Sequence, residues 1–306
     1  MKTVIVTGGA GFIGSHTIEC LIRTGYKVLC VDNLRTGRLK NLDAVFNHPN
    51  FEWVKLDVCD EHCMEAVFKH IQPDAVLHLA ALVSVPESFE KLQVNHMLNF
   101  KATEIIAKQC INVQCHRMVF ASSAAVYGDY PELPCKETAT PDPKSPYAEK
   151  KLESERLLMA LSKDHPNFDP ICFRYFNVYG SRQDPKSPYS GVLSIFSDCF
   201  KNNTPITVFG DGNQTRDFVP VKAVATVNKM ALSAPLGVKG IYNVCTGYAR
   251  PLNSILEELT CIYQRTPPIQ YLPEREGDIR HSRGDNRLLS NTFGVQISPI
   301  LNLKSV

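Results

Sequence analysis

The hydrophobic residues in the first half of the chain alternate between short continuous runs and longer stretches with helical spacing. Continuous apolar runs are typical of strands that are covered on both faces of a sheet. They predict strands at Thr3–Val6, Lys27–Val31, Glu52–Leu56, Ala75–Leu79 and Met118–Phe120. The helical spacing predicts helices at Ile13–Arg23, Glu61–His70, Leu92–Cys110 and Tyr147–Leu161, the last with Ser145 as N-cap and Pro146 in its first turn.

Strands that alternate with helices at this repeat predict an α/β fold with a doubly wound parallel sheet. After about Tyr179, prolines and glycines punctuate shorter elements and the alternation weakens. No Gly/Ser-rich or charged tract separates the two parts of the sequence. We therefore expect the second part to form a smaller α/β lobe packed against the sheet rather than an independent domain on a linker.

The composition is that of an ordinary globular protein and narrows the classes of function. The 306 residues carry a formal net charge of +2 and the basic residues are dispersed, which disfavours nucleic acid as a partner. No apolar run approaches the ~18 residues that span a bilayer, so we expect no association with a membrane through a spanning helix. We also expect no secretory leader, because a short strand pattern follows Met1 directly.

Eleven cysteines are scattered through the sequence. Cys59 and Cys63, with His62 between them, have a spacing that zinc ligands can use, but no second pair follows at the spacing of a zinc finger. We therefore expect free thiols and no metal site. An odd number of cysteines without a leader is typical of a protein in the reducing cytoplasm.

A glycine-rich segment, TGGAGFIGS at residues 7–15, joins the first predicted strand to the first predicted helix. Glycines at Gly8, Gly11 and Gly14 let backbone N–H groups and a helix N-terminus approach a pyrophosphate. A tight turn also needs glycine. However, Asp32 ends the second predicted strand, at the distance expected for an acid that binds a ribose. Together these features predict a dinucleotide site.

Asp32 and Asn33 favour NAD over NADP, because a carboxylate accepts hydrogen bonds from ribose hydroxyls and repels a 2′-phosphate. Arg35 and Arg38 follow closely, and we interpret them as solvated cations of the loop. Asp57, followed by Val58, ends the third predicted strand. Its carboxylate either meets the adenine amino group or caps the next helix.

Tyr147 and Lys151 are four residues apart and therefore share one face of a helix. A phenol titrates near pH ~10, and a nearby ammonium together with a nicotinamide cation lowers that pKa enough to make a base. Tyr-x-x-x-Lys alone is common on salt-bridged surface helices. Here Ser122 and Ser123 end a predicted strand, where a hydroxyl can bind an alcohol or ketone. The combination predicts hydride transfer at a secondary alcohol.

Several motifs resemble the extended short-chain dehydrogenase/reductase family and, within it, the NAD-dependent nucleotide-sugar epimerases, most of all the UDP-glucose/UDP-N-acetylglucosamine 4-epimerases. The resemblance runs over nearly the whole chain. It implies an NAD-binding Rossmann domain over residues 1–178 and a mainly substrate-binding lobe over residues 179–306. The motifs are TGGAGFIGS (7–15), HLAA (78–81), SSAAVYGD (122–129), YAEKK (147–151), RYFNVYG (174–180), FGDGNQTRDFV (209–219) and REGDIRHS (275–282).

The resemblance also implies roles for individual residues, beside those that the spacing predicts. The catalytic residues are expected to be Ser123, Tyr147 and Lys151. The expected NAD-binding residues are Gly8, Gly11, Phe12, Ile13, Gly14, Asp32, Asn33, Asp57, Val58, Leu79, Ala80, Ala81, Ser122, Tyr147, Lys151 and Phe176. The expected UDP-sugar-binding residues are Ser84, Ser123, Asn177, Val192, Thr207, Val208, Phe209, Arg216, Arg275, Asp278 and Ser282.

Within that resemblance, arginines Arg216 and Arg275 match the clamp on the diphosphate, as the fit of guanidinium forks to phosphate oxygens suggests. Asp278 matches the ligand of the uridine ribose, and residues 207–209 match the uracil pocket. Without the resemblance, residues 207–209 are a core strand, and Arg280 or Arg283 are equally good phosphate ligands.

Two alanines disfavour two related reactions, dehydration and decarboxylation. The similar 4,6-dehydratases carry an Asp-Glu pair after the serine or threonine, and the similar decarboxylases carry a glutamate, where this chain has Ala124 and Ala125. Epimerisation at C4 needs no further acid or base: Tyr147 takes the hydroxyl proton, NAD takes the C4 hydride, and the hydride returns to the opposite face of the 4-keto sugar. The alternatives are 4-epimerisation of UDP-glucuronate, dehydration, or a non-catalytic NAD(H) sensor.

Departures from the family pattern bear on substrate and stability. Val83 stands where epimerases specific for UDP-glucose and UDP-galactose often have lysine. Ser282 is small at the position that gates the space beside C2 of the sugar, which predicts tolerance of UDP-GlcNAc and UDP-GalNAc. Pro220 and Ala223 replace the usual aromatic or histidine and the usual aspartate, and the sequence stops at Val306, sooner than most relatives.

Relatives typically dimerise through two long helices of each subunit. The predicted helices at residues 92–110 and 147–161 are the corresponding elements, so we expect a homodimer. The alternative is that the apolar faces of both helices pack only on the sheet.

Overall fold

The computed structural model describes residues 1–185, 191–274 and 278–305, which form two compact units. The first unit comprises residues 1–123, 145–174 and 222–242, and the second comprises residues 124–144, 175–221 and 243–306. This division differs from the single boundary expected after residue 178. Residues 222–242 return to the first unit because they add a helix and a strand to its sheet.

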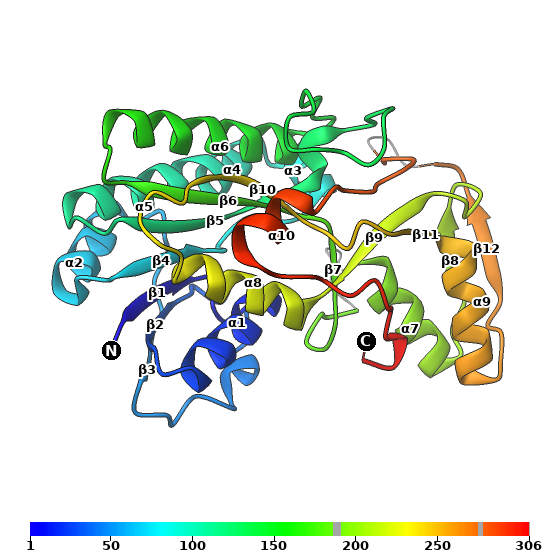
Figure 1. The fold of residues 1–306 in the computed structure, drawn as a ribbon. Coiled ribbons are helices and arrows are strands. Elements are labelled where there is room, and N and C mark those ends of the chain that lie inside the picture. Colours follow the sequence, from blue (N-terminus) through cyan, green and yellow to red (C-terminus); the bar gives the residue numbers. More distant parts are fainter. Residues whose placement is uncertain (186–190, 275–277, 306) are drawn as a thin grey trace. The chain divides into compact units, whose positions relative to one another are not determined.

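A seven-stranded sheet is the centre of the first unit, in the order β10-β6-β5-β4-β1-β2-β3 (Figure 1). β1 pairs in parallel with β2 and with β4, β2 pairs in parallel with β3, and β4 with β5. The doubly wound parallel sheet is therefore confirmed. Its strands are β1 (Thr3–Thr7), β2 (Lys27–Val31), β3 (Phe51–Val54), β4 (Ala75–His78), β5 (Arg117–Ser123), β6 (Asp169–Tyr175) and β10 (Gly240–Val244).

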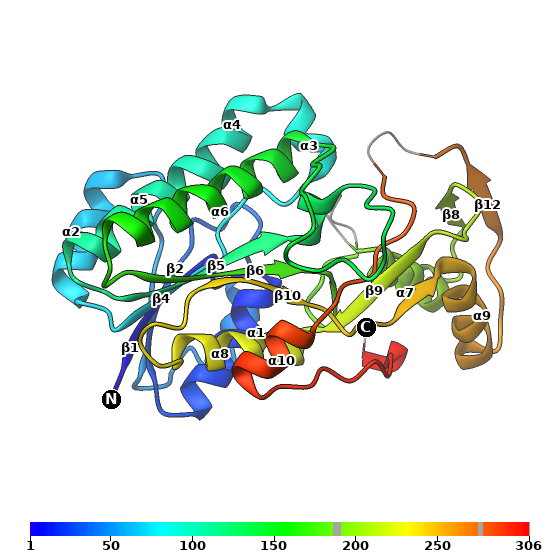
Figure 2. The same cartoon turned by 45° about the horizontal axis from the view of Figure 1, so that its top comes forward.

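Helices cover both faces of this sheet (Figures 1 and 2). One face carries α2 (Glu61–Ile71), α5 (Ala102–Asn112) and α6 (Pro146–Asp164), which share a hydrophobic core with the strands. The other face carries α1 (Phe12–Arg23) and α8 (Val221–Leu232), joined by a buried hydrogen bond from Asn228 to Thr17. The remaining helical segments of this unit are η1 (Leu39–Leu42), α3 (Val85–Glu90), α4 (Leu92–His96) and η2 (Met97–Lys101).

The start of α6 follows the predicted capping pattern. The Ser145 hydroxyl oxygen accepts a hydrogen bond from the Ala148 N–H at 3.3 Å, and Pro146 occupies the first turn. Two further contacts fix this end, since Ser88 accepts from the Tyr147 N–H at 3.2 Å and Asn95 donates to the Pro146 carbonyl at 2.8 Å. The helix that carries the predicted tyrosine–lysine pair is thus held firmly at its first turn.

The single helix predicted over residues 92–110 is present as three consecutive segments, α4, η2 and α5. The middle segment, η2, is a π-helix, a conformation often found at functional sites. It carries Asn99, whose side-chain amide binds both backbone groups of Leu82, at 3.2 and 2.9 Å. The π-helical turn therefore fixes the loop that follows β4.

The second unit contains two small sheets and a core of its own, formed by residues of α7, α9, β8 and their neighbours. β9 pairs in parallel with β7 and antiparallel with β11, and β12 pairs in parallel with β8. The elements are η3 (Ala124–Tyr127), β7 (Asn177–Tyr179), α7 (Val192–Asn202), β8 (Ile206–Phe209), β9 (Thr215–Pro220), β11 (Ala249–Pro251), α9 (Leu252–Tyr263), β12 (Ile269–Leu272), α10 (Arg287–Phe293) and η4 (Leu303–Ser305).

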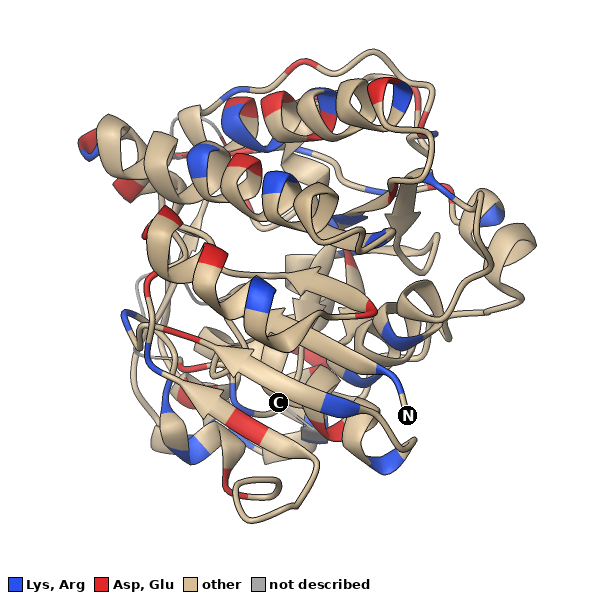
Figure 3. Ribbon diagram, turned by 90° about the vertical axis from the view of Figure 1, so that its left-hand side faces the viewer, with Lys and Arg blue, Asp and Glu red and all other residues tan. Residues whose placement is uncertain are grey.

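Charged residues of both signs alternate along the helices visible in Figure 3. Several are ion pairs one helical turn apart, such as Glu104 with Lys108 at 3.0 Å. The eleven cysteines, all in the described part of the chain, are free thiols. Within the described ranges, no helix combines the length and the apolar character needed to cross a membrane.

Candidate active site

The glycine loop after β1 lies at the point where the strand order reverses, with β2 on one side of β1 and β4 on the other. Open α/β sheets bind ligands at such a point. Gly8 has φ +67°, and a Cβ there would lie 2.7 Å from the Ala80 nitrogen. A Cβ on Gly14, in the first turn of α1, would lie 2.4 Å from the Gly8 carbonyl oxygen. The glycines therefore let this loop pack against the start of α1 and against the loop after β4 more closely than any side chain would allow, which shapes a cradle of backbone groups at the helix N-terminus.

Asp32 directly follows β2 and is buried beside this loop. Its carboxylate accepts hydrogen bonds from the Ala10 N–H at 2.9 Å and from the Leu34 N–H at 2.8 Å. Burial raises the pKa of Asp32, and the two backbone donors oppose that shift. A buried carboxylate tied to the glycine loop is well placed to accept hydrogen bonds from ribose hydroxyls, so these residues fit a dinucleotide.

Asp57 lies in the turn after β3 and is linked to Asn33, which donates to it at 3.0 Å. Its other oxygen accepts from the Cys59 N–H at 2.9 Å. The cap of α2 is a different residue, Asp60, which accepts from the Cys63 N–H at 3.0 Å. The helix-capping alternative for Asp57 is therefore wrong. Val58 is buried in the core beneath this turn.

The predicted cofactor residues Leu79, Ala80 and Ala81 form the loop after β4. Thr7 fixes this loop, because its carbonyl accepts from the Leu79 N–H at 3.1 Å and its hydroxyl accepts from the Ala80 N–H at 3.3 Å. The same hydroxyl lies 2.7 Å from Nδ1 of His78. Desolvation lowers the pKa of His78 to about 3, so the buried imidazole is neutral.

The structure brings Ser123, Tyr147 and Lys151 together, Ser123 from the end of β5 and the other two from successive turns of α6. Desolvation raises the pKa of the Tyr147 phenol, and a hydrogen bond from the Ser123 hydroxyl opposes this. The Lys151 ammonium is buried, donates to the Ala121 carbonyl at 2.8 Å and lies 5.9 Å from the centre of the Tyr147 ring. Desolvation lowers the pKa of Lys151 to about 7. Such a trio can move a proton at a substrate hydroxyl.

Ser122, expected at the cofactor, directs its hydroxyl to Glu155, at 2.5 Å from Oε1. Glu155 also accepts two hydrogen bonds from Arg174, at 2.9 and 2.7 Å. The sequence motifs do not predict a role for Glu155 or for the side chain of Arg174. The sequence spacing could have pointed to Glu155, because it lies four residues after Lys151 and therefore on the same helical face as Tyr147 and Lys151.

The residues expected to hold a nucleotide sugar lie mainly in the second unit. Arg216 on β9 forms an ion pair with Asp278 at 2.5 Å, and burial lowers the pKa of its guanidinium. Arg275 lies outside the described residues. Asn177 begins β7, Val192 begins α7, and Thr207, Val208 and Phe209 belong to β8, as the strand interpretation of residues 207–209 predicts. Phe176, which was expected at NAD, is buried directly before β7.

Two further expected sugar ligands have contacts of their own. The Ser84 oxygen caps α3 by accepting from the Glu87 N–H at 3.0 Å. The Ser282 N–H donates to the Thr215 carbonyl at 3.1 Å, which joins the 281–282 segment to β9. Arg280, one of the two alternative phosphate-ligand candidates beside Arg283, forms a two-pronged ion pair with Asp211, at 2.7 Å for each contact.

The cradle generates a test of cofactor binding. We expect Gly14→Ala to weaken dinucleotide binding at least about tenfold, because the methyl group would collide with the Gly8 carbonyl at the helix N-terminus. Calorimetric titration with NAD measures the effect. Gly25→Ala is the control: it has open space around the added carbon but a φ of +84°, so it costs stability and leaves NAD affinity unchanged. Equal NAD affinity in the Gly14 variant and the wild type would contradict the assignment.

Comparison with known proteins assigns the family. The chain is 32% identical over 297 residues to the UDP-glucose 4-epimerase of Mycolicibacterium smegmatis, covering 97% of this chain and 93% of that protein. It also matches the structure of the UDP-N-acetylglucosamine 4-epimerase from Methanobrevibacter ruminantium in complex with UDP-N-acetylmuramic acid, with a TM-score of 0.93 and 36% identity over 99% of this chain and 95% of that chain.

A third match is the structure of the UDP-glucose 4-epimerase of Thermus thermophilus in complex with NAD, with a TM-score of 0.88 and 32% identity over 99% of this chain and 96% of that chain. Residues 4–245 match the model of the NAD dependent epimerase/dehydratase family. The resemblance expected from the motifs and the expectation of NAD as the cofactor are therefore confirmed, and the chain belongs to the NAD-dependent epimerase/dehydratase family.

Proposed function

We propose that this protein is a UDP-sugar 4-epimerase that inverts C4 of UDP-glucose and UDP-galactose and also of UDP-GlcNAc and UDP-GalNAc. The observation that carries the proposal is the trio of Ser123, Tyr147 and Lys151 in the same compact unit as the glycine cradle. The relatives support it, because each of the three is named as a 4-epimerase of UDP-glucose or UDP-N-acetylglucosamine.

The reaction removes the proton of the 4-hydroxyl and the hydride of C4, and returns both, the hydride to the opposite face of the sugar. Tyr147 takes the proton of the 4-hydroxyl and gives it back, and the Lys151 ammonium stabilises the phenolate. Ser123 donates a hydrogen bond to the phenolate or to the sugar oxygen. NAD, when bound, supplies the hydride acceptor and donor that this chemistry needs. Atoms and charges balance over the cycle, so no net oxidation occurs.

The sister reactions lack the groups they need. A dehydratase moves further protons at neighbouring carbons, and the positions after Ser123 are Ala124 and Ala125, whose side chains carry no proton that can be transferred. The same argument disfavours decarboxylation. A sensor without catalysis would have no use for the buried ammonium beside Tyr147, so we keep it only as the outcome that the assay below would reveal.

We propose that the two units bind different ligands. We propose that the first unit, which contains most of residues 1–178, binds NAD through the cradle and Asp32. The second unit supplies the diphosphate ligand Arg216 and the ribose ligand Asp278. These two side chains already pair with each other, so the guanidinium fork is held in place before a phosphate arrives.

We propose that Ser282 sets the tolerance for N-acetylated sugars. Its backbone is fixed on β9 through the Thr215 carbonyl, so the position is defined while its side chain is small. A bulky residue at this position would occupy the space that an acetamido group needs. UDP-GlcNAc and UDP-GalNAc are therefore substrates beside the unsubstituted hexoses.

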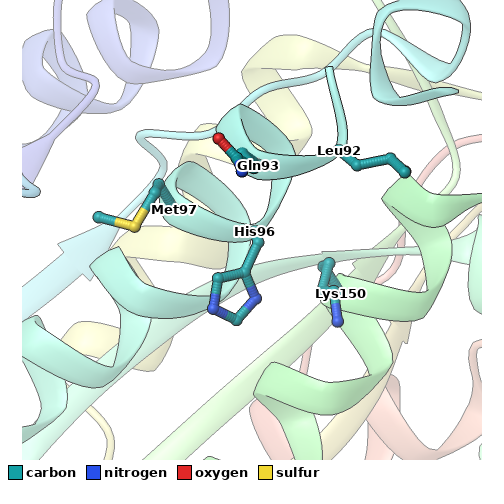
Figure 4. A pocket seen from close by; sticks show the side chains of 5 residues that line it. All are labelled: Leu92, Gln93, His96, Met97 and Lys150. Carbon is teal, nitrogen blue, oxygen red and sulfur yellow. The ribbon is translucent and has the colours of Figure 1, made fainter. Parts of the chain in front are cut away.

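We further propose a homodimer formed through the helices of the α4–α6 face. Leu92 and Met97 leave 59% and 40% of their surface exposed there, which is costly for an unpartnered helix face. Figure 4 shows Leu92, Gln93, His96 and Met97 along α4 and the start of η2, beside Lys150 of α6. A second copy of the same face would cover these apolar groups. Mixed charges along the helices give no support for nucleic acid as a partner.

The activity is tested by separate incubation with the four UDP-sugars, with and without added NAD, and by chromatography of the products. We expect conversion to the 4-epimer without net NADH. Tyr147→Phe should lower kcat roughly 10²–10⁴-fold with little change in KM, because only proton transfer is lost. Tyr248→Phe, at an exposed tyrosine, is the control. No conversion of any of the four by NAD-loaded protein would reject the proposal and favour a sensor.

The specificity proposal makes a separable prediction. Ser282→Tyr should lower kcat/KM for UDP-GlcNAc and UDP-GalNAc at least about tenfold and leave the values for UDP-glucose and UDP-galactose nearly unchanged, since a steric clash affects only the acetamido group. Steady-state kinetics on all four substrates measures this. A wild-type enzyme that turns over UDP-galactose and leaves UDP-GalNAc untouched would already contradict it.

Light scattering coupled to size-exclusion chromatography tests the oligomeric state. We expect a dimer mass for the wild type and a monomer mass for Leu92→Glu, because a buried charge at the interface costs several kcal/mol, on the order of 2–5. Leu236→Glu is the control, at an exposed leucine in the segment between α8 and β10. A clean monomer for the wild type would overturn the proposal.

A further inference from the structure

Three consecutive residues at the end of β5 contact three residues of α6 that are each one helical turn apart. Residues at i, i+4 and i+8 share a helical face, so α6 presents a tyrosine, a lysine and a glutamate in one row. Each of these side chains contacts one residue of the strand: the tyrosine and the glutamate contact serine hydroxyls, and the lysine contacts a main-chain carbonyl. The pairs are Ser123 with Tyr147, Ala121 with Lys151, and Ser122 with Glu155.

The third pair extends to a buried ion pair. Both carboxylate oxygens of Glu155 accept hydrogen bonds from the guanidinium of Arg174 on β6, and the two side chains are 1% and 2% exposed. Oε1 also accepts the Ser122 hydroxyl hydrogen. A two-pronged arginine–carboxylate pair fixes the carboxylate in position as well as in charge. Glu155 is therefore an immobile anion one turn beyond Lys151.

Lys151 needs such an anion more than an exposed lysine would. Its ammonium is buried, with the Ala121 carbonyl as its hydrogen-bond acceptor and the Phe120 ring 4.8 Å away. Taking an ammonium out of water favours its neutral form, which has no charge to stabilise a phenolate. Desolvation accordingly lowers the pKa of Lys151, and the charge of Glu155 acts in the opposite direction.

The other groups around Lys151 do not replace Glu155. Tyr147 on the same helix is the group to be stabilised, and the serines of β5 are neutral. His78 on β4 is buried and uncharged. Arg174 on β6 is a cation that partly cancels the charge of Glu155.

We propose that Glu155 is a positioning residue for catalysis, which keeps Lys151 charged and directed at Tyr147, and that Arg174 limits how strongly it does so. This inference deepens the proposed function and rests on it for the role of Tyr147. Glu155 acts through Lys151 and does not touch the substrate.

Removing the charge of Glu155 and removing the charge of Arg174 should then have different effects on the Lys151 pKa. Glu155→Gln removes the anion and leaves Arg174 uncompensated, so the Lys151 pKa should fall by about one unit or more. Arg174→Gln removes the cation that partly cancels the charge of Glu155. The anion then acts more strongly on Lys151, so the Lys151 pKa should stay the same or rise. If Glu155 had a purely structural role, the Lys151 pKa should shift in the same direction in both variants, because each variant breaks the same buried ion pair.

NMR titration of the lysine ε-methylene groups in NAD-loaded protein measures the Lys151 pKa, with Lys151→Arg used to assign the signal. Glu153→Gln is the matched control: it removes another ion-paired carboxylate of α6, half-buried and bonded to Lys150, and should leave the Lys151 pKa unchanged. The titration requires no turnover, so it remains readable even if no UDP-sugar is converted. Equal shifts in the same direction for the Glu155 and Arg174 variants, or no shift in the Glu155 variant, would overturn the inference.

Activity provides the second measurement. The ammonium exists below the Lys151 pKa and is lost above it, so Glu155→Gln should move the alkaline limb of the kcat profile to lower pH by the same shift. If Glu155→Gln does not fold, the double variant Glu155→Gln with Arg174→Gln removes both charges at similar volume. Its Lys151 pKa should lie below the wild-type value, and a wild-type value in that variant would contradict the role of Glu155.

Discussion

A buried ammonium is the constraint on which this active site depends. Lys151 must keep its charge in a place without water, so its surroundings supply a hydrogen-bond acceptor, an aromatic face and an anion held at a fixed distance. That requirement explains why β5 and α6 meet through polar pairs at their active ends and through apolar packing elsewhere. In the proposed mechanism, the same ammonium stabilises the Tyr147 phenolate and so lets Tyr147 act as a base at neutral pH.

The sheet supplies the setting for this charge. The reversal of strand order at β1 places the glycine loop and the loop after β4 on neighbouring strands, and Thr7 joins the two loops through its carbonyl and its hydroxyl. On the outer side, the π-helical turn holds the second loop through Asn99. The glycine cradle and the trio of Ser123, Tyr147 and Lys151 are thus fixed by buried polar contacts within one compact unit.

Local patterns predicted much of this arrangement. The strand runs, the capping of α6 by Ser145 and the face shared by Tyr147 and Lys151 all follow from short-range rules and are present in the structure. The features that the sequence did not predict depend on residues that are far apart in the chain. Arg174 lies on another strand from Glu155, the π-helical turn has no periodicity signal, and the return of residues 222–242 to the large sheet follows from packing against α1 and β6. The hydroxyl of Ser122 belongs to the same class, since its partner is 33 residues away.

The central claim is that hydride leaves and returns to the same carbon within one closed cycle. The most direct test follows UDP-glucose that carries deuterium at C4 through conversion by the NAD-loaded enzyme in ordinary water, with NMR and mass spectrometry of the UDP-galactose formed. The account predicts that the deuterium remains at C4 of the product, because the hydride is returned by the same cofactor and does not exchange with solvent. Loss of the label to water, or transfer of the label to another carbon, would contradict it.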